Sequence, residues 1–586
     1  MSAGSRYRRL PIARGSRLSG FPYLNNEPVA RGHEDARGLP GRVKPASRQT
    51  AVMVPAFGGR DRTCVKLSLK MQPHRRTTLL LFVFFQALYA LTSSGNAFRV
   101  PDEFEVYFQV EHLVDEGDLS VPQTLAIRSA NGDSIFFGKV GLDRKPYAPY
   151  GPLAAVLALP HHLIGRALAA LAGVPRAPLP AGIVWVFLVG GITMTATATA
   201  AALAVAGFHR AALALGTPAR TAFTLAIVLG GATVLWPYGT GFYSEAWQAA
   251  AFIWAAALLL EARQGSPRAR VTVASLLLAA AGLTKVTSLV FTPPFVIAVL
   301  CDRSQSNRTR IEVAIALSAA IALSAGAHLT WNAYRFGQPF DFGYNWALET
   351  IPQLPTRQFL ASDVPRGLAV LLLSPGKSIF VWAPVLLLAL WRAKRFARLE
   401  PAVAAGIALT TGIGLVFFAA YLFPEGGYSH GPRNLVPIIP LMLLPAGGQD
   451  SRLSAAPLIA CTGVGLIMAL LAVSVSFLED QGLGDDLGSG ARTVYYERIT
   501  PPPGRVWNRY RLDYMPFVSA MREPGWLHAE RLGEGPDFFP LHLMQARRQL
   551  PNGQAIPLWL IWAMPMFWSG MLAAAAAALA RQFSYS

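Results

Sequence analysis

The chain has 586 residues, of which 53% are hydrophobic and only 15% are charged. Soluble proteins are about 25% charged, and apolar runs of 18 or more residues are typical of membrane spans. The composition therefore indicates a polytopic integral membrane protein and excludes collagen-like, disordered and disulfide-rich classes. The three cysteines, Cys64, Cys301 and Cys461, suggest neither a disulfide framework nor a metal site.

The net charge of +19 is concentrated at the N-terminus. Residues 1–76 hold 16 Lys and Arg against 4 Asp and Glu. We expect residues 1–77 to be a basic, disordered cytoplasmic tail that touches anionic lipid headgroups. The alternative is that translation starts at Met71. Nucleic-acid binding is not expected, because the tail has no recognisable fold or motif for it.

The first apolar stretch, 78–95, is expected to stay in the membrane as a signal anchor, because the long polar segment before it is unlike a cleavable signal peptide. The next segment, 97–150, carries nine acidic residues against five basic ones. Such a loop after a basic cytoplasmic flank is expected on the outer side of the membrane. We extend this first outer loop to 97–180.

Residues 151–172 are apolar enough to span the membrane but include Pro160 and Arg166. If this segment spans, the Arg-containing loops 207–220 and 263–270 fall outside. If it lies on the membrane surface as an amphipathic helix, these loops are cytoplasmic. The positive-inside rule favours the surface helix.

The remaining apolar stretches predict an all-α polytopic membrane fold with about 12 transmembrane helices. After 78–95, spans are expected at 181–206, 221–237, 243–262, 270–284, 286–300, 310–330, 378–392, 402–423, 432–447, 455–476 and 557–580. Arg- and Lys-rich turns then face the cytoplasm, and aromatic, Gly-rich loops face outside. The domain plan is a transmembrane module at 78–477, a polar outer segment at 478–555, and a last span with a short cytoplasmic end at 556–586.

Asp102 and Glu103 stand just past the first span, at the expected outer surface. Apolar residues recur behind them at helical spacing. Adjacent carboxylates at this place can act on a hydroxyl, one as the general base and the other orienting it. Asp102 also suits a helix N-cap, and Glu105 completes a capping-box-like pattern. The residues alone leave catalysis and capping equally supported and compatible.

The stretch 137–152 places Arg144 and Lys145 ahead of Tyr147 and Tyr150. Such a cluster can hold a phosphate with aromatic support. Tyr and Lys are also common anchors at a membrane interface, and from the residues alone this second interpretation is favoured.

Four charged residues lie near the outer ends of apolar stretches, namely Glu245, Lys285, Arg335 and Arg433. Intramembrane ionisable groups are costly and are candidates for function. Either Glu245, Lys285 and Arg433 converge on one site, or they snorkel to the interface; for Arg335 we expect snorkelling. The sequence carries no metal motif, phosphate-binding Gly-rich loop or nucleophile elbow, so no metal or cofactor is expected.

An Asp-Glu pair directly after the first span, in a large outer loop, resembles the GT-C superfamily of membrane glycosyltransferases. That group includes the protein O-mannosyltransferases and the lipid A aminoarabinose transferases. Later segments resemble bacterial members in their order: DRKPYAPYGP, WPYGTGFYSE, AGLTKVTSL, NAYRFGQPFDFGY and YSHGPRNLVPIIP. The resemblance covers roughly residues 78–450; the tail and the 478–555 segment have no counterpart.

The resemblance implies transfer of a sugar from a polyprenyl-phosphate donor to an acceptor hydroxyl, on the outer face of a bacterial inner membrane. It implies Asp102 as the general base, with Glu103 supporting it. Phosphate is a fair leaving group, so the site needs one base and cations for the phosphate. Candidates for binding the donor phosphate are Arg144, Lys145, Lys285 and Arg433, and candidates for contacting the substrate are Tyr147, Tyr150 and Glu245. Direct attack by the acceptor predicts inversion at the anomeric carbon.

Two other functional classes are compatible with the same residues. A transporter of lipids or lipid-linked sugars would use the intramembrane charges as a pathway, and a non-catalytic membrane scaffold would not need them. The crowding of acids in the first outer loop favours the enzyme. The sugar, the acceptor and any partner subunit are not indicated by the sequence.

Overall fold

The computed structural model describes residues 73–94, 101–122, 138–176, 183–265, 267–343, 363–421, 429–448, 454–474, 538–549 and 556–584, together with 424 and 426. Two predictions fall outside these residues. They are the disorder of the basic tail up to residue 72 and the nature of most of the polar segment 478–555.

The described residues are largely helical, with one small antiparallel hairpin within 97–180, the predicted first outer loop. The helices are α1 (Pro73–Leu91), α2 (Pro101–Asp115), α4 (Leu153–Leu171), α5 (Ile183–Ala214), α6 (Ala219–Gly231), α7 (Leu235–Thr240), α8 (Glu245–Ala262), α9 (Pro267–Thr284), α10 (Pro293–Cys301), α11 (Asn307–Phe336), α13 (Val364–Leu373), α14 (Ile379–Trp382), α15 (Leu386–Leu399), α16 (Pro401–Ala419), α17 (Ile439–Leu443), α18 (Ala455–Ser474), α22 (Phe539–Gln549) and α23 (Leu558–Ser584), and the 3-10 segments are η1 (Val286–Phe291), η2 (Arg433–Ile438) and η3 (Leu444–Ala446). In the hairpin, β1 (Lys139–Val140) pairs with β2 (Pro146–Tyr147). The predicted helical class is confirmed at this level.

Within the described residues, six helices are long and apolar enough to cross a membrane, judged by length and composition. These are α4, α5, α11, α16, α18 and α23. The predicted count of twelve spans is not confirmed.

Four of the predicted spans are interrupted rather than continuous. The stretch 286–300 divides into η1 and α10 at Thr292, just before Pro293. The stretch 221–237 divides into α6 and α7, and 378–392 divides into α14 and α15 around Pro384. The stretch 432–447 consists of the short segments η2, α17 and η3, which contain Pro437, Pro440 and Pro445. Proline removes a backbone donor and clashes with the preceding turn, so it breaks a regular helix.

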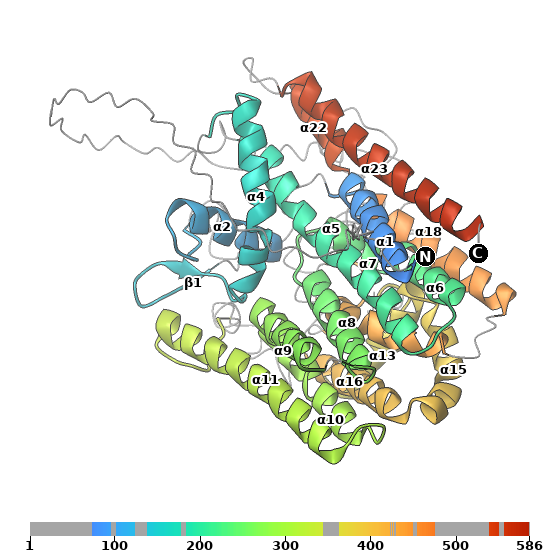
Figure 1. The fold of residues 1–586 in the computed structure, drawn as a ribbon. Helices are drawn as coiled ribbons and strands as arrows, with labels where there is room; N and C mark the ends of the chain where they lie inside the picture. The colour runs from blue at the N-terminus through green and yellow to red at the C-terminus, as the bar shows by residue number, and fades with distance from the viewer. Residues whose placement is uncertain are drawn as a thin grey trace, which may run out of the picture. The chain divides into compact units, whose positions relative to one another are not determined.

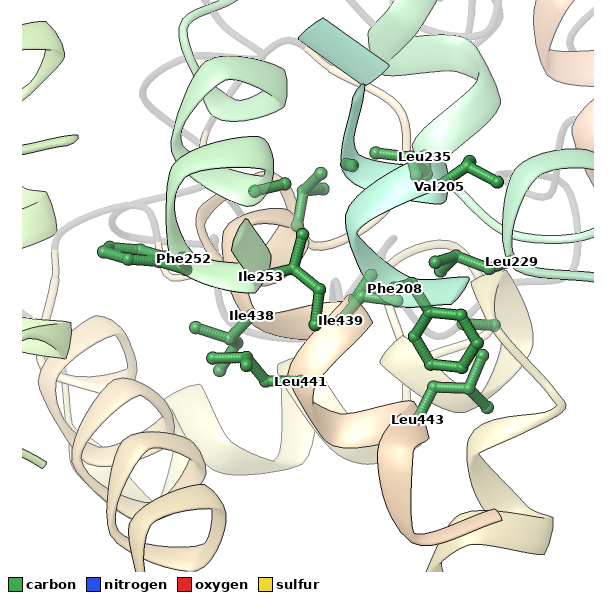
Figure 2. Close-up of a cluster of buried hydrophobic side chains, with 14 of the residues drawn as sticks. Val205, Phe208, Leu229, Leu235, Phe252, Ile253, Ile438, Ile439, Leu441 and Leu443 are labelled. Carbon is green, nitrogen blue, oxygen red and sulfur yellow. The ribbon is translucent and has the colours of Figure 1, made fainter. Parts of the chain in front are cut away.

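The interrupted segment η2–α17–η3 lies inside the protein. Figure 2 shows Ile438, Ile439, Leu441 and Leu443 in one buried cluster with side chains of α5 and α8. Irregular backbone at membrane depth is tolerated where protein rather than lipid surrounds it. The burial of this segment therefore allows the prolines to break the helix.

Helix α8 packs between α5 and α9 in the middle of the bundle (Figure 1). At one end of this bundle Arg210 pairs with Glu261 at 2.6 Å, and Arg263 pairs with Asp302 at 2.8 Å and Glu400 at 2.9 Å. These contacts bring the ends of α5, α8, α10 and α15 together. Glu245, the first residue of α8, lies at the opposite end.

Helix α5 is longer than the helices beside it. Its 32 residues extend about 48 Å, against about 30 Å for a bilayer core. The Thr197 hydroxyl donates to the Gly241 carbonyl, just before α8 begins. The part of α5 that precedes Thr197 packs on α4, and there His162 Nδ1 lies 3.1 Å from Thr193 Oγ1. Helix α4 thus lies beside the part of α5 that extends past α8. The surface position of 151–172 stays a prediction, because α4 also has the length and hydropathy of a span.

Candidate active site

The first turn of α2 carries the predicted Asp-Glu pair. The helix begins at Pro101, a residue favoured at the first helical position because its missing N–H needs no partner there. Asp102 and Glu103 follow in the first turn, where the helix dipole favours negative charge. Asp102 is therefore inside the helix, and its carboxylate binds Arg433. The capping-box interpretation of Asp102 and Glu105 is wrong.

Arg433 is the first residue of η2 and connects α2 to the centre of the protein. Its Nη1 contacts Asp102 Oδ2, and its Nε donates to Glu245 Oε1 at 2.8 Å. The guanidinium lies over the Tyr243 ring, 4.4 Å from its centroid. Only 7% of the Arg433 side chain is exposed, so the structure places a buried cation between two acids.

Lys285 completes this group. It follows the last residue of α9, and its Nζ donates to the same Glu245 oxygen at 2.8 Å. We call Asp102, Glu245, Lys285 and Arg433 the charged quartet. The predicted convergence of Glu245, Lys285 and Arg433 is thus seen directly in these contacts, and snorkelling does not describe them.

Glu103 and Glu105 have structural contacts instead. Glu103 is fully buried and accepts from the Phe242 N–H at 3.0 Å, which ties α2 to the turn before α8. Glu105 is also buried and accepts from the Gly138 N–H at 2.6 Å, at the start of the hairpin. Of the three acids at this end of α2, Asp102 alone is partly exposed.

The expectation that Arg335 snorkels is wrong. Its side chain is buried at the C-terminal end of α11, where it donates to Ala148 O at 2.5 Å and Asn332 Oδ1 at 2.7 Å. Its guanidinium lies 5.0 Å from the Trp331 ring centroid and 4.6 Å from that of Phe336. Arg335 therefore holds the segment after β2 against α11, a role that its position at the end of an apolar run did not reveal.

The described contacts of Lys145 and Tyr147 are with Asp118, Asp143 and α11. Arg144 is exposed with a left-handed φ of 66°, and Lys145 donates to Asp118 at 2.5 Å. Tyr147 is buried, donates to Asp143 at 2.7 Å and packs its ring against Trp331. Tyr150 is buried among apolar side chains of α2 and α4. The predicted substrate roles of these four residues stay predictions.

Two aromatic residues near the quartet were not singled out from the sequence. Tyr243 supports the Arg433 guanidinium, and Tyr238 donates to His430 O at 2.9 Å, three residues before Arg433. Both belong to the loop WPYGTGFYSE, whose aromatic and Gly content was the available signal.

The described residues contain no group of three or more His, Cys, Asp or Glu side chains that could hold a metal ion. An apolar cavity of about 110 Å³ lies at the other end of the bundle, where Arg263 and Asp302 line it together with apolar residues such as Phe295 and Ile407. This cavity is remote from the quartet, which lies at the opposite end of α8.

No family model and no curated protein matches this chain. Among solved structures, similar ones include apo ArnT from Cupriavidus metallidurans, at 16% identity and a TM-score of 0.44, covering 86% of this chain and 76% of that one. The apo oligosaccharyltransferase of Archaeoglobus fulgidus is similar at 12% identity and a TM-score of 0.44, covering 76% of this chain and 63% of that one. The archaeal oligosaccharyltransferase AglB from Archaeoglobus fulgidus, in complex with an inhibitory peptide and a dolichol-phosphate, is similar at 11% identity and a TM-score of 0.41, covering 76% of this chain and 63% of that one.

At TM-scores below 0.5, these similarities carry no conclusion about activity. We therefore argue the function from the charged quartet.

Proposed function

We propose that the protein is a membrane glycosyltransferase that moves a sugar from a polyprenyl-phosphate donor to an acceptor hydroxyl. The observation that carries this proposal is the charged quartet. It combines a partly exposed carboxylate, Asp102, with two buried cations, Lys285 and Arg433, on either side of Glu245. A base for a hydroxyl and cations for a departing phosphate are the groups that this transfer needs.

The proposed reaction uses each group once. Asp102 accepts the proton of the acceptor hydroxyl while that oxygen attacks the anomeric carbon. The bond between this carbon and the phosphate oxygen breaks, and the polyprenyl phosphate leaves with the electron pair. Lys285 and Arg433 stabilise the negative charge on the departing phosphate. A single displacement of this kind inverts the configuration at the anomeric carbon.

The position of the quartet suits a lipid-linked donor. Asp102 lies near the start of the predicted outer loop 97–180, in the helix that follows α1, and Lys285 and Glu245 stand at the ends of apolar helices at the same end of the bundle. A donor whose tail lies in the bilayer brings its phosphate to such a level. We propose the periplasmic face of a bacterial inner membrane as the location. Arg144, Lys145, Tyr147 and Tyr150 are kept as proposed contacts for the donor or the acceptor.

The test begins with mass analysis of cell-surface glycans and lipids from cells with and without the protein, because the sugar and acceptor must first be found. The purified full-length protein in proteoliposomes should then transfer that sugar from its polyprenyl-phosphate donor, and Asp102→Asn should not. A transporter would move the lipid across the bilayer without forming a glycosidic bond. A scaffold would do neither, and unchanged glycans and lipids in the deletion strain would contradict the enzyme.

A further inference from the structure

Arg433 uses different ends of its guanidinium for the two acids of the quartet. Its Nε binds Glu245 and its Nη1 binds Asp102. The two acids differ in exposure, because 1% of the Glu245 side chain is exposed and 26% of the Asp102 side chain is. A ligand that arrives from solvent can therefore compete for the contact with Asp102, whereas the contact with Glu245 is out of its reach.

The Glu245 side of this arrangement is fixed in several ways. Glu245 opens α8, where the helix dipole favours a negative charge. One of its oxygens binds both Lys285 and Arg433, so a single acid sets the spacing of two cations. The Tyr243 ring covers one face of the Arg433 guanidinium. Movement of Arg433 is therefore easiest at the end that binds Asp102.

Charge balance gives a reason for such movement. The two acids and two cations of the quartet have formal charges that sum to zero, as buried ionic groups require. An incoming phosphate adds negative charge beside Asp102. Arginine binds phosphate oxygens in a favourable forked geometry, so phosphate is a strong competitor for the Nη end of Arg433.

Resting on the proposed function, we infer that Glu245 is a positioning residue, the anchor on which Arg433 turns from Asp102 to the donor phosphate. No covalent bond is made or broken in this exchange; one ion pair replaces another. Asp102 is occupied by Arg433 before the donor binds and is free to accept a proton afterwards. The acceptor hydroxyl, or water in its place, is thus activated only when the donor is present.

A double-mutant cycle on phosphate binding tests the exchange without turnover. Farnesyl phosphate, a short isoprenyl monophosphate, is titrated by calorimetry into the full-length protein in nanodiscs. Asp102→Asn removes the negative charge that competes for Arg433, leaving only a weaker hydrogen-bond acceptor, and should tighten binding on the order of tenfold. In an Arg433→Gln background the same Asp102→Asn change should alter binding less than about twofold. Equal tightening in both backgrounds would mean simple loss of a negative charge and would overturn the inference.

Further variants separate anchoring from general electrostatics. Glu245→Gln should weaken binding at least about tenfold and remove the effect of Asp102→Asn, and Glu245→Asp should restore part of both. Glu312→Gln, which removes the acid of an exposed Arg–Glu pair at the other end of the bundle, should change nothing. If Glu245→Gln fails to fold, the Asp102/Arg433 cycle still decides.

The two proposals fail in different ways. A wild-type protein that binds farnesyl phosphate, with Asp102→Asn acting alike in both backgrounds, would sink the anchoring role and leave the donor site standing. A wild-type protein that does not bind the probe at all would overturn both.

Discussion

Asp102 and Glu103 are adjacent in the chain, but their carboxylates have different surroundings. Glu103 is fully buried and holds the Phe242 N–H, whereas Asp102 is partly exposed and faces Arg433. A general base must reach the acceptor hydroxyl, and a fully buried carboxylate that holds a backbone turn is poorly placed to do so. The geometry therefore favours Asp102 as the base and gives Glu103 a supporting role through the backbone.

The first prediction concerns Asp102→Asn. Asparagine can still accept a hydrogen bond from Arg433, and Arg433 keeps its hydrogen bond to Glu245. The free energy of unfolding should therefore fall by only about 1–2 kcal/mol. The rate of sugar transfer should fall by roughly 10²–10⁴-fold, because the base is lost. Thermal unfolding and a transfer assay on the same preparation measure the two effects. Transfer at the wild-type rate would remove Asp102 from the base role.

Glu103→Ala is the matched second prediction. It leaves the buried Phe242 N–H without this acceptor, which should cost about 1–3 kcal/mol of unfolding free energy. Transfer should fall less than in Asp102→Asn, because Asp102 itself is retained. The opposite ranking, with Glu103→Ala stable but inactive, would exchange the two roles.

Glu105 gives a prediction about pH. Burial raises the pKa of Glu105 well above its ordinary value, against the hydrogen bond from Gly138, which lowers it. The native protein therefore keeps this proton at pH values where the unfolded chain, with a carboxyl pKa of about 4.3, has lost it. The stability due to Glu105 is fully present below about pH 4.3 and is lost as the pH rises through the raised pKa.

The neutral variant Glu105→Gln should thus match the wild type near pH 4 and be at least as stable near pH 8. Melting temperature as a function of pH measures this. Asp118→Asn is the contrasting control. Burial acts to raise the pKa of Asp118, but hydrogen bonds from Lys145 and Ser120 hold it below its ordinary value. Its contribution is present above about pH 3.9 and lost in acid, so this variant should lose stability near pH 8. A Glu105→Gln protein that is weaker near pH 8 would contradict the argument.

How far the sequence predicted the site can be seen in four charged residues. Glu245, Lys285 and Arg433 were singled out because a charge in apolar sequence must find a partner, and their mutual contacts follow from that need. Arg335 gave the same local signal, yet its partners are the Ala148 carbonyl and two aromatic rings. A single sequence shows that a charge needs partners but does not show which distant segment supplies them.

At the scale of elements, the hairpin is held on the end of α11. Arg335 reaches Ala148 just after β2, the Leu142 N–H donates to Arg335 O, and Lys139 pairs with Asp341. A side chain at Gly141 would collide with Arg335 O, since its Cβ would lie 2.8 Å away. The close approach of these two backbones explains why the loop uses glycine there.

Arg335→Ala should therefore loosen the first outer loop. It removes a buried, hydrogen-bonded and ring-packed side chain, and we expect a loss of about 2–4 kcal/mol of unfolding free energy. Arg335→Lys should not restore it, because an ammonium lacks the planar fork. Arg308→Ala, on the same helix but 90% exposed, is the control and should cost less than about 0.5 kcal/mol. Thermal unfolding compares the three variants, and equal losses for Arg335→Ala and Arg308→Ala would refute the docking role.

Hydropathy predicted where apolar segments lie better than where helices break. The limits of α8 and α18 follow the predicted 243–262 and 455–476 closely. The stretch 432–447 has equally apolar sequence but lies inside the protein, where broken backbone is tolerated. Its prolines, Pro432, Pro437, Pro440 and Pro445, were the signal in the sequence that the helix is broken, and its apolarity alone did not show the break.

At the scale of the whole bundle, the described helix ends form two sets. Glu245, Lys285 and Arg433 lie at one end, and the ion pairs of Arg210, Arg263 and their acids lie at the other. In the loops and helix ends of the second set, basic residues outnumber acidic ones. The basic residues there are Arg210, Arg220, Arg263, Arg268, Arg270, Arg303, Arg308, Arg310, Arg392, Lys394, Arg395 and Arg398, and the acidic ones are Glu261, Asp302, Glu312 and Glu400. The positive-inside rule therefore predicts that this end is cytoplasmic and that the quartet lies at the outer face.

Cysteine labelling tests this orientation as the last prediction. In a background without the native cysteines, Arg144→Cys on the exposed hairpin should react with a membrane-impermeant maleimide on intact cells or spheroplasts. Ser304→Cys and Lys394→Cys, both exposed at the Arg-rich end, should react only after permeabilisation. Positions 304 and 394 lie close in the chain to Asp302 and Glu400, which both pair with Arg263. The two cysteine variants should therefore label from the same side of the membrane. Labelling of Ser304→Cys and Lys394→Cys without permeabilisation, with Arg144→Cys protected, would invert the topology and move the proposed transfer to the cytoplasmic face.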